Sequence, residues 1–180
     1  MLALRLTAKN PGMHTPGRGD QALRRHRVSL PGHSYFATLC TRNRANVLNQ
    51  PSVAAALRAE INSIETDSHW TFRAGVAMPD HLHLFIRLSG GLPLSRCIAR
   101  FKTKTNPALR GVGWQANFHE HRLRPDDSVE SVLRYIFLNP YRENLVPKEE
   151  AYPWFWLGRE EASWFTALTG DGLPFPEWLR

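Results

Sequence analysis

The stretch that decides the fold of this 180-residue chain reads Met78-Pro79-Asp80-His81-Leu82-His83-Leu84-Phe85-Ile86-Arg87-Leu88. Leucine or isoleucine stands at every second position from 82 to 88, which is the pattern of a strand. Pro79-Asp80 predicts a tight turn into it from another strand at about 70–78, so a hairpin is expected. His81 and His83 share a face and could hold one metal ion, although such a pair is equally compatible with a surface or packing role.

The segments around this hairpin predict the fold class. A β-prone run covers 34–41, a helix opens at Pro51-Ser52, a basic helix covers about 94–104, and a fourth strand covers 114–124. The order strand, helix, strand, strand, helix, strand is that of the ferredoxin-like βαββαβ fold, an α+β class. We therefore expect an antiparallel sheet with both helices on one face and the other face free for a ligand.

One additional helix is predicted after this core, at about 128–138. Asp127, with a glutamate three residues later, has the spacing of a capping box. Tyr135 and Asn139 are four residues apart and therefore neighbours at the rim of the apolar stripe of this helix. Pro140 is expected to end the helix directly after Asn139.

Length and composition indicate one domain with tails. We expect a flexible basic arm over 1–27, the main domain over 28–147, and an aromatic-rich C-terminal cover over 148–180 that holds four of the six tryptophans. No apolar run is long enough to span a membrane. Cys40 and Cys97 offer neither a zinc quartet nor a disulfide framework, so a reducing, cytoplasmic location is the default expectation.

The net charge of +7 is concentrated in two segments. Residues 1–27 hold six basic residues against one acidic residue, and residues 96–124 hold seven against one. Such blocks suit a phosphate backbone, although a solvated basic surface is the alternative. The residues expected to contact DNA are Arg24, Arg25, Arg27, Arg96, Arg100, Lys102, Lys104, Arg122 and Arg124.

These features together are compatible with chemistry on a DNA strand. Two neutral imidazoles and one amide oxygen leave open positions on a divalent ion, which can polarise a phosphodiester oxygen. A tyrosine hydroxyl that attacks such a phosphate forms a covalent phosphotyrosine. This bond keeps the energy of the broken strand, so rejoining needs no nucleotide cofactor. The residues therefore favour a strand-nicking and strand-joining enzyme.

Three separated motifs resemble one known family. They are the Met-Pro-Asp-His-Leu-His-Leu run, Trp114-Gln115 with Phe118 and His121, and Arg134-Tyr135-Ile136-Phe137-Leu138-Asn139-Pro140-Tyr141-Arg142 followed by Leu145-Val146. In this order they are similar to the REP-associated tyrosine transposases, which belong to the HUH single-strand nucleases. The resemblance covers roughly residues 27–155, including Tyr35-Phe36-Ala37-Thr38 and Tyr152-Pro153-Trp154.

The resemblance implies a domain that binds single-stranded or hairpin DNA and cleaves it with one tyrosine. It implies that Tyr135 takes the 5′-phosphate and that His81, His83 and Asn139 bind Mg²⁺ or Mn²⁺. Histidine ligation alone would equally suit Zn²⁺. Two departures are visible: Asp80 stands where the family often has Asn, and Tyr141 with Glu143-Asn144 replaces the more usual Val and Ala-Gly.

Several alternatives stay open on the sequence. His119 and His121 form a second His-x-His pair that could be a metal site, although the family pattern places the ion at the first pair. Tyr35, Tyr141 and Tyr152 are alternative nucleophiles, but ordinary packing is the better interpretation for each. The protein could bind structured single-stranded DNA without cleaving it. A metal-dependent enzyme acting on a small substrate is disfavoured by the two basic blocks. The target DNA, a monomeric or homodimeric state, and whether Tyr135 meets the metal of its own chain are left undecided.

Overall fold

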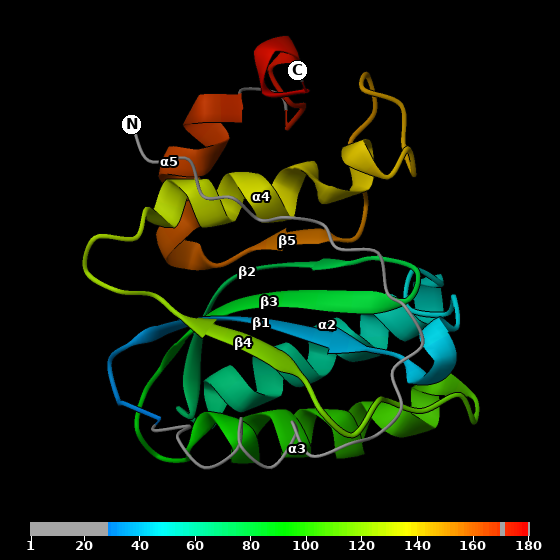
Figure 1. The fold of residues 1–180 in the computed structure, drawn as a ribbon, viewed down its shortest axis with the longest axis vertical. Helices are drawn as coiled ribbons and strands as arrows, with labels where there is room; N and C mark the ends of the chain where they lie inside the picture. The colour runs from blue at the N-terminus through cyan, green and yellow to red at the C-terminus, as the bar shows by residue number, and fades with distance from the viewer. Residues whose placement is uncertain (1–28, 170–171, 180) are drawn as a thin grey trace, which may run out of the picture.

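The computed structural model describes residues 29–169 and 172–179, which form a five-stranded sheet with helices packed on it (Figure 1). The strands lie in the order β4-β1-β3-β2-β5, and every neighbouring pair is antiparallel. The elements along the chain are β1 (Ser34–Cys40), α2 (Pro51–Thr66), β2 (Trp70–Ala77), β3 (His81–Leu88), α3 (Leu94–Thr105), β4 (His119–Arg122), α4 (Val129–Arg142), β5 (Phe155–Leu157) and α5 (Arg159–Thr169).

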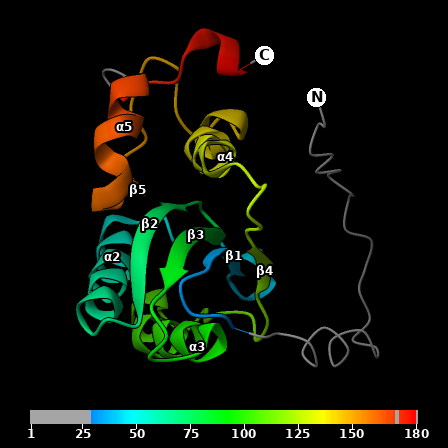
Figure 2. The ribbon, with the colours of Figure 1, turned by 90° about the vertical axis from the view of Figure 1, so that its left-hand side faces the viewer.

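The first four strands and the first two helices confirm the predicted ferredoxin-like α+β fold. β2 and β3 form the expected hairpin, closed by a hydrogen bond from the Met78 backbone N–H to the His81 carbonyl at 2.9 Å. α2 and α3 lie together on one face of the sheet (Figure 2). The fifth strand, β5, comes from the aromatic-rich segment and extends the sheet beyond β2, which the sequence did not predict.

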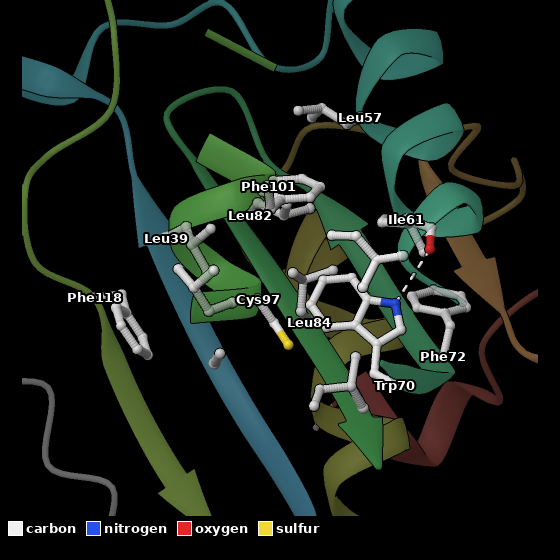
Figure 3. Close-up of a cluster of buried hydrophobic side chains, with 14 of the residues drawn as sticks. Leu39, Leu57, Ile61, Trp70, Phe72, Leu82, Leu84, Cys97, Phe101 and Phe118 are labelled. Atoms are coloured by element: carbon white, nitrogen blue, oxygen red, sulfur yellow. Dashed lines mark hydrogen bonds between the residues drawn. The ribbon is translucent and has the colours of Figure 1, made fainter. Parts of the chain in front are cut away.

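The alternating pattern of β3 explains why α2 and α3 share a face. The leucine and isoleucine side chains of this strand point towards the two helices and are at most 1% exposed. Trp70 of β2 lies in the same cluster, and its indole N–H donates to the Ile61 carbonyl of α2 at 3.2 Å (Figure 3). Removal of this apolar surface from water is the main driving force that holds the two helices on the sheet.

The second face of the sheet is only partly free for a ligand, because it is covered over β2 and β3 but exposed at β4. α4 packs across β2 and β3 on this face, and α5 lies beside it (Figure 2). Leu133 and Phe137 of α4 meet Ala74 and Val76 of β2 and Phe85 of β3 in a second core. The hairpin carries apolar residues on both faces over its middle, so the second face also has to be covered.

The N-terminal cap of α4 is Ser128, whose hydroxyl accepts a hydrogen bond from the Ser131 backbone N–H at 3.1 Å. The capping role predicted for Asp127 is therefore wrong. The Asp127 carboxylate instead accepts the backbone N–H of Arg124 at 2.8 Å and stabilises the turn that leads into the helix.

Pro140 does not end α4, which continues to Arg142. The proline removes one helical donor, but the helix resumes directly, and the Glu143 N–H donates to the Asn139 carbonyl at 3.1 Å. Tertiary contacts hold this last turn in place. Tyr141 is buried, and its hydroxyl donates to the Glu150 carbonyl at 2.9 Å.

The fourth strand is shorter than predicted, because only His119–Arg122 pair with β1. Trp114 makes an isolated bridge with Thr41 instead of joining the strand. Its indole N–H donates to the Thr105 hydroxyl at 2.9 Å, at the end of α3. Packing of this large ring against α3 therefore takes the segment before β4 out of the sheet.

Residues 1–27, including Arg24, Arg25 and Arg27, lie outside the described residues, so the basic arm stays a prediction. The division of the chain at 147 also stays a prediction. In the aromatic-rich segment, Phe155 of β5 and Phe165 of α5 contact Phe137 of α4, with ring centroids 5.1 and 5.4 Å away. Within the described ranges, no helix is long and apolar enough to cross a bilayer.

Phe137 gives a direct test of this second core. It is 3% exposed and contacts aromatic rings from β5, α5 and the C-terminal end. We expect Phe137→Ala to lower the free energy of unfolding by about 3–5 kcal/mol, measured by chemical denaturation. Leu145→Ala, at a side chain 39% exposed, is the control and should change it by less than about 0.5 kcal/mol. Equal effects of the two variants would contradict the packing described for α4.

Candidate active site

The two histidines of β3 point to the face that α4 covers. They alternate with the leucines that pack on α2 and α3, as the strand pattern predicted. His81 and His83 lie with their Nε2 atoms 3.2 Å apart and their ring planes at 80°. The two Nε2 atoms therefore converge on one point beside the sheet.

The other ring nitrogen of each histidine has its own partner. His81 Nδ1 lies 2.6 Å from the Asp80 carboxylate, and His83 Nδ1 lies 2.9 Å from the Thr38 hydroxyl on β1. Asp80 also receives a hydrogen bond from Arg44 at 3.0 Å. The ring orientations are thus set by side chains from three segments of the chain.

The surroundings lower the pKa of both His83 and Asp80, but for different reasons. His83 is 4% exposed, and this burial lowers its pKa well below the usual range, with His81 and Arg44 lowering it further. Burial raises the pKa of Asp80, but hydrogen bonds and charge from His81 and Arg44 outweigh it, so the net pKa lies below its ordinary value. At neutral pH His83 is therefore neutral and Asp80 is ionised, as metal ligation by the imidazole requires.

Tyr135 of α4 lies directly beside this cluster. Its ring centroid is 5.6 Å from that of His83 and 5.7 Å from that of Phe36 on β1. Phe36 in turn stacks on His83 at 5.1 Å. Tyr135 is half-buried at the rim of the α4 interface, where the helical spacing predicted it. The tyrosine and both histidines belong to the same chain.

Asn139 is buried one turn further along α4, with 8% of its surface exposed. Its side-chain N–H₂ donates to the Tyr135 carbonyl at 3.4 Å, so the amide oxygen is the atom of this side chain that can accept a hydrogen bond or bind a cation. Among the described residues, no hydrogen bond joins Asn139 to His81 or His83.

The donor set is compatible with a divalent ion. Within residues 29–169 and 172–179, no group of three or more His, Cys, Asp or Glu side chains is placed to hold a metal. A metal at the two Nε2 atoms therefore needs an oxygen of another kind, such as the Asn139 amide or a substrate phosphate. An incomplete ligand set of this kind keeps positions open for substrate.

The predicted DNA-binding residues are spread over the molecule. Arg96 and Lys104 are exposed on α3, on the opposite side of the sheet from Tyr135. Arg100 forms ion pairs with Glu60 of α2 and with Asp67, the residue that caps the C-terminal end of α2. Lys102 donates to the Gln115 and Asn117 carbonyls, while Arg122 and Arg124 are exposed at β4. The structure thus brings none of the α3 residues to the histidine face.

The second His-x-His pair lies on the same face, because His119 pairs with Thr38 and His121 pairs with Phe36 in the sheet. Both are exposed, and His121 Nε2 lies 3.0 Å from the Asp127 carboxylate.

The other tyrosines have structural partners. The Tyr35 hydroxyl accepts the Leu30 N–H at 2.7 Å, and the Tyr141 hydroxyl bonds to Glu150. The Tyr152 hydroxyl donates to the Ala77 carbonyl at 2.8 Å, and burial raises the pKa of Tyr152 to about 12. A neutral, half-buried phenol with a carbonyl partner is poorly placed to act as a nucleophile.

Sequence reasoning missed Thr38 and Arg44 as members of this site. A signal for Thr38 was available, because β1 lies beside β3 in the ferredoxin-like order and Thr38 alternates with residues of the first core. Arg44 follows β1 in a short turn where Asn43 and Arg44 both have φ of 55°. No sequence pattern indicates that this turn reaches Asp80.

Comparisons with known proteins define the family. The family described as "Transposase IS200 like" matches residues 29–137, more than half of the chain. The chain therefore belongs to the IS200-like transposase family. The curated REP-associated tyrosine transposase of Escherichia coli (strain K12) is 27% identical over 139 residues, covering 76% of this chain and 83% of that protein. The predicted resemblance to the REP-associated tyrosine transposases is confirmed.

A solved structure supports the fold. The REP-associated tyrosine transposase bound to a REP hairpin matches this chain with a TM-score of 0.65 at 23% identity. The match covers 83% of this chain and 87% of the solved one. The two proteins are similar in the arrangement of the sheet and helices.

The lowered pKa of His83 predicts how stability depends on pH. As pH falls through about 6.5, the unfolded chain takes up a proton at this residue that the folded chain does not, so the free energy of unfolding should decrease. The denaturant midpoint should fall as the pH is lowered from about 8 to about 5, and this fall should be smaller in His83→Gln than in the wild type. An unchanged pH slope in His83→Gln would show that the burial of this imidazole is not responsible.

Proposed function

We propose that this protein nicks and joins single-stranded DNA through a 5′-phosphotyrosine at Tyr135, with His81, His83 and Asn139 as ligands of Mg²⁺ or Mn²⁺. The observation that carries the proposal is the position of the Tyr135 ring, 5.6 Å from the ring of His83. A nucleophile and two convergent imidazoles thus meet on one face of one chain. Membership of a transposase family adds the class of reaction.

Each residue has a defined part in this reaction. A bound divalent ion would supply positive charge to a non-bridging phosphate oxygen and orient the phosphate for in-line attack. The Tyr135 hydroxyl oxygen attacks phosphorus as its proton leaves to water, and the bond from phosphorus to the 3′ oxygen breaks. That oxygen leaves as a 3′ hydroxyl after taking a proton. Attack by another 3′ hydroxyl on the phosphotyrosine reverses the exchange and joins the strands.

Phe36 and α4 hold the tyrosine in place for this attack. The Phe36 ring contacts both Tyr135 and His83, so the nucleophile and one metal ligand share a common support. Because α4 is anchored by the second core, Tyr135 needs no residue from another chain to reach the histidines. We propose that a single chain holds the complete site, whether the protein is a monomer or a homodimer.

The proposed substrate is hairpin-containing single-stranded DNA. The similar solved structure is of a REP-associated tyrosine transposase bound to a REP hairpin, which makes this substrate class the first to test. The net charge of +7, with Arg122 exposed in β4 and Arg124 exposed just after it, suits a phosphate backbone.

The test is incubation of the full chain with a labelled hairpin-containing single strand and Mn²⁺ or Mg²⁺. We expect a denaturant-resistant protein–DNA adduct and a free 3′ end. Binding that weakens as salt rises, without an adduct, would favour the alternative, a protein of the same fold that binds structured DNA without cleaving it. No binding at all would favour a small substrate.

A further inference from the structure

Both imidazoles of the proposed metal site are held at the nitrogen that does not face the metal position. His81 Nδ1 contacts Asp80, and His83 Nδ1 contacts Thr38, while the two Nε2 atoms face each other. A neutral imidazole carries one proton, and its position decides which nitrogen has the lone pair. The partners at Nδ1 therefore control whether Nε2 can bind a cation.

Asp80 determines the tautomer of His81. An ionised carboxylate can only accept, so the hydrogen bond of 2.6 Å places the proton on His81 Nδ1. The lone pair of the ring is then on Nε2 and points to the metal position. A carboxylate that accepts from a ligating imidazole also makes that ligand more basic.

Asp80 is itself fixed from two sides. The Thr41 backbone N–H and hydroxyl both donate to the Asp80 carbonyl, at 2.9 and 3.0 Å. Arg44 donates to Oδ2, the carboxylate oxygen that His81 does not use. The turn before β3 and the orientation of the carboxylate are thus set by the segment that follows β1.

Thr38 has a different part, because its hydroxyl can donate or accept. With the lone pair on His81 Nε2, the contact of 3.2 Å between the two Nε2 atoms is a hydrogen bond when His83 carries its proton on Nε2. His83 Nδ1 then accepts from the Thr38 hydroxyl at 2.9 Å. If the proton of His83 is instead on Nδ1, the Thr38 hydroxyl can accept a hydrogen bond from Nδ1. Both Nε2 atoms then have a lone pair that can bind a cation.

From this geometry we infer that Asp80 and Thr38 are positioning residues of the metal site. Asp80 holds His81 in the tautomer that presents Nε2, and Thr38 allows His83 to change from the tautomer that donates to His81 to the tautomer that presents Nε2. The inference rests on the proposed function, in which both imidazoles bind the metal. The chemical class of ligand is a divalent cation with open positions for phosphate oxygens.

The tautomers can be measured directly, without metal or DNA. In long-range ¹H–¹⁵N spectra of the full chain at about pH 8, where ordinary imidazoles are neutral, His81 should carry its proton on Nδ1 and His83 on Nε2. Asp80→Ala should shift His81 towards the Nε2-protonated tautomer, and Asp80→Asn, which keeps an acceptor oxygen, should retain the wild-type tautomer. A wild-type His81 protonated on Nε2 overturns the inference.

Cation binding tests the same residues through affinity. The free Mn²⁺ signal in electron paramagnetic resonance should show that Asp80→Ala and Thr38→Val each raise the Mn²⁺ dissociation constant by about 10-fold or more. Asp80→Asn and Thr38→Ser should stay within about 3-fold of wild type, because each retains the hydrogen-bonding atom. If Asp80→Asn weakens binding as much as Asp80→Ala, the carboxylate acts by charge and not by positioning.

His81→Ala separates this inference from the proposed function. Loss of Mn²⁺ binding in His81→Ala, with Asp80→Ala and Thr38→Val unchanged, leaves the metal site standing and removes the positioning roles. Mn²⁺ binding that survives His81→Ala refutes the metal site itself. Circular dichroism of each variant shows that the fold is retained.

Discussion

Tyr135→Phe is expected to form no covalent adduct with DNA, while its affinity for the same strand stays within about 3-fold of wild type. The hydroxyl oxygen is the only atom removed, and the ring contacts with His83 and Phe36 are kept. Because no other group in the proposed reaction forms the bond to phosphorus, the rate of adduct formation should fall at least about 10³-fold. The measurement is a denaturing gel of labelled hairpin DNA beside a binding titration at fixed salt.

Tyr152→Phe is the matched control for this result. It also removes one tyrosine hydroxyl, but that hydroxyl bonds to the Ala77 carbonyl. It should retain the adduct and lose only about 0.5–1.5 kcal/mol of stability. An adduct of wild-type yield in Tyr135→Phe would show that another residue is the nucleophile.

Removal of the metal should have the second large effect. A chelator should abolish adduct formation, and added Mn²⁺ or Mg²⁺ should restore it, because the phosphate then regains the charge that polarises it. His81→Ala and His83→Ala should each lower the rate by about 10²-fold or more, and Asn139→Ala should do so if its amide oxygen completes the ligand set. The readout is the initial rate of adduct formation against metal concentration.

His121→Ala provides the control for the histidine variants. This residue lies on the same sheet face, but it is exposed and contacts Asp127. Adduct formation by His121→Ala should depend on the metal in the same way as adduct formation by the wild type. Loss of metal dependence in His121→Ala, with retention in His81→Ala, would move the metal site to the second pair.

Much of the fold could be predicted from local patterns. The period-2 repeat of β3 and the turn at Pro79-Asp80 are properties of neighbouring residues, so the hairpin and the facing of His81 and His83 followed directly. The 3.6-residue period of α4 placed Tyr135 at the rim of its apolar stripe, where the structure has it.

Features that depend on distant contacts were not predictable in this way. Pro140 is within a helix because Tyr141 is anchored beyond it, and Trp114 leaves the predicted strand because its indole packs on α3. The second face of the sheet is covered over β2 and β3 because the hairpin is apolar on both sides, and this cover comes from α4, which is distant in the sequence.

By itself, the sequence determined the order of the first four strands and the first two helices, the shared face of the two histidines and the positions of the residues that could act on DNA. These follow from spacing along the chain, because the geometry of a strand or a helix sets the direction in which each side chain points. Only the tertiary structure decided that Tyr135 lies beside His83 and that Asp80 and Thr38 contact the two imidazoles. Such contacts depend on how β1, β3 and α4 pack, and packing is set by the summed burial of many side chains, not by local spacing.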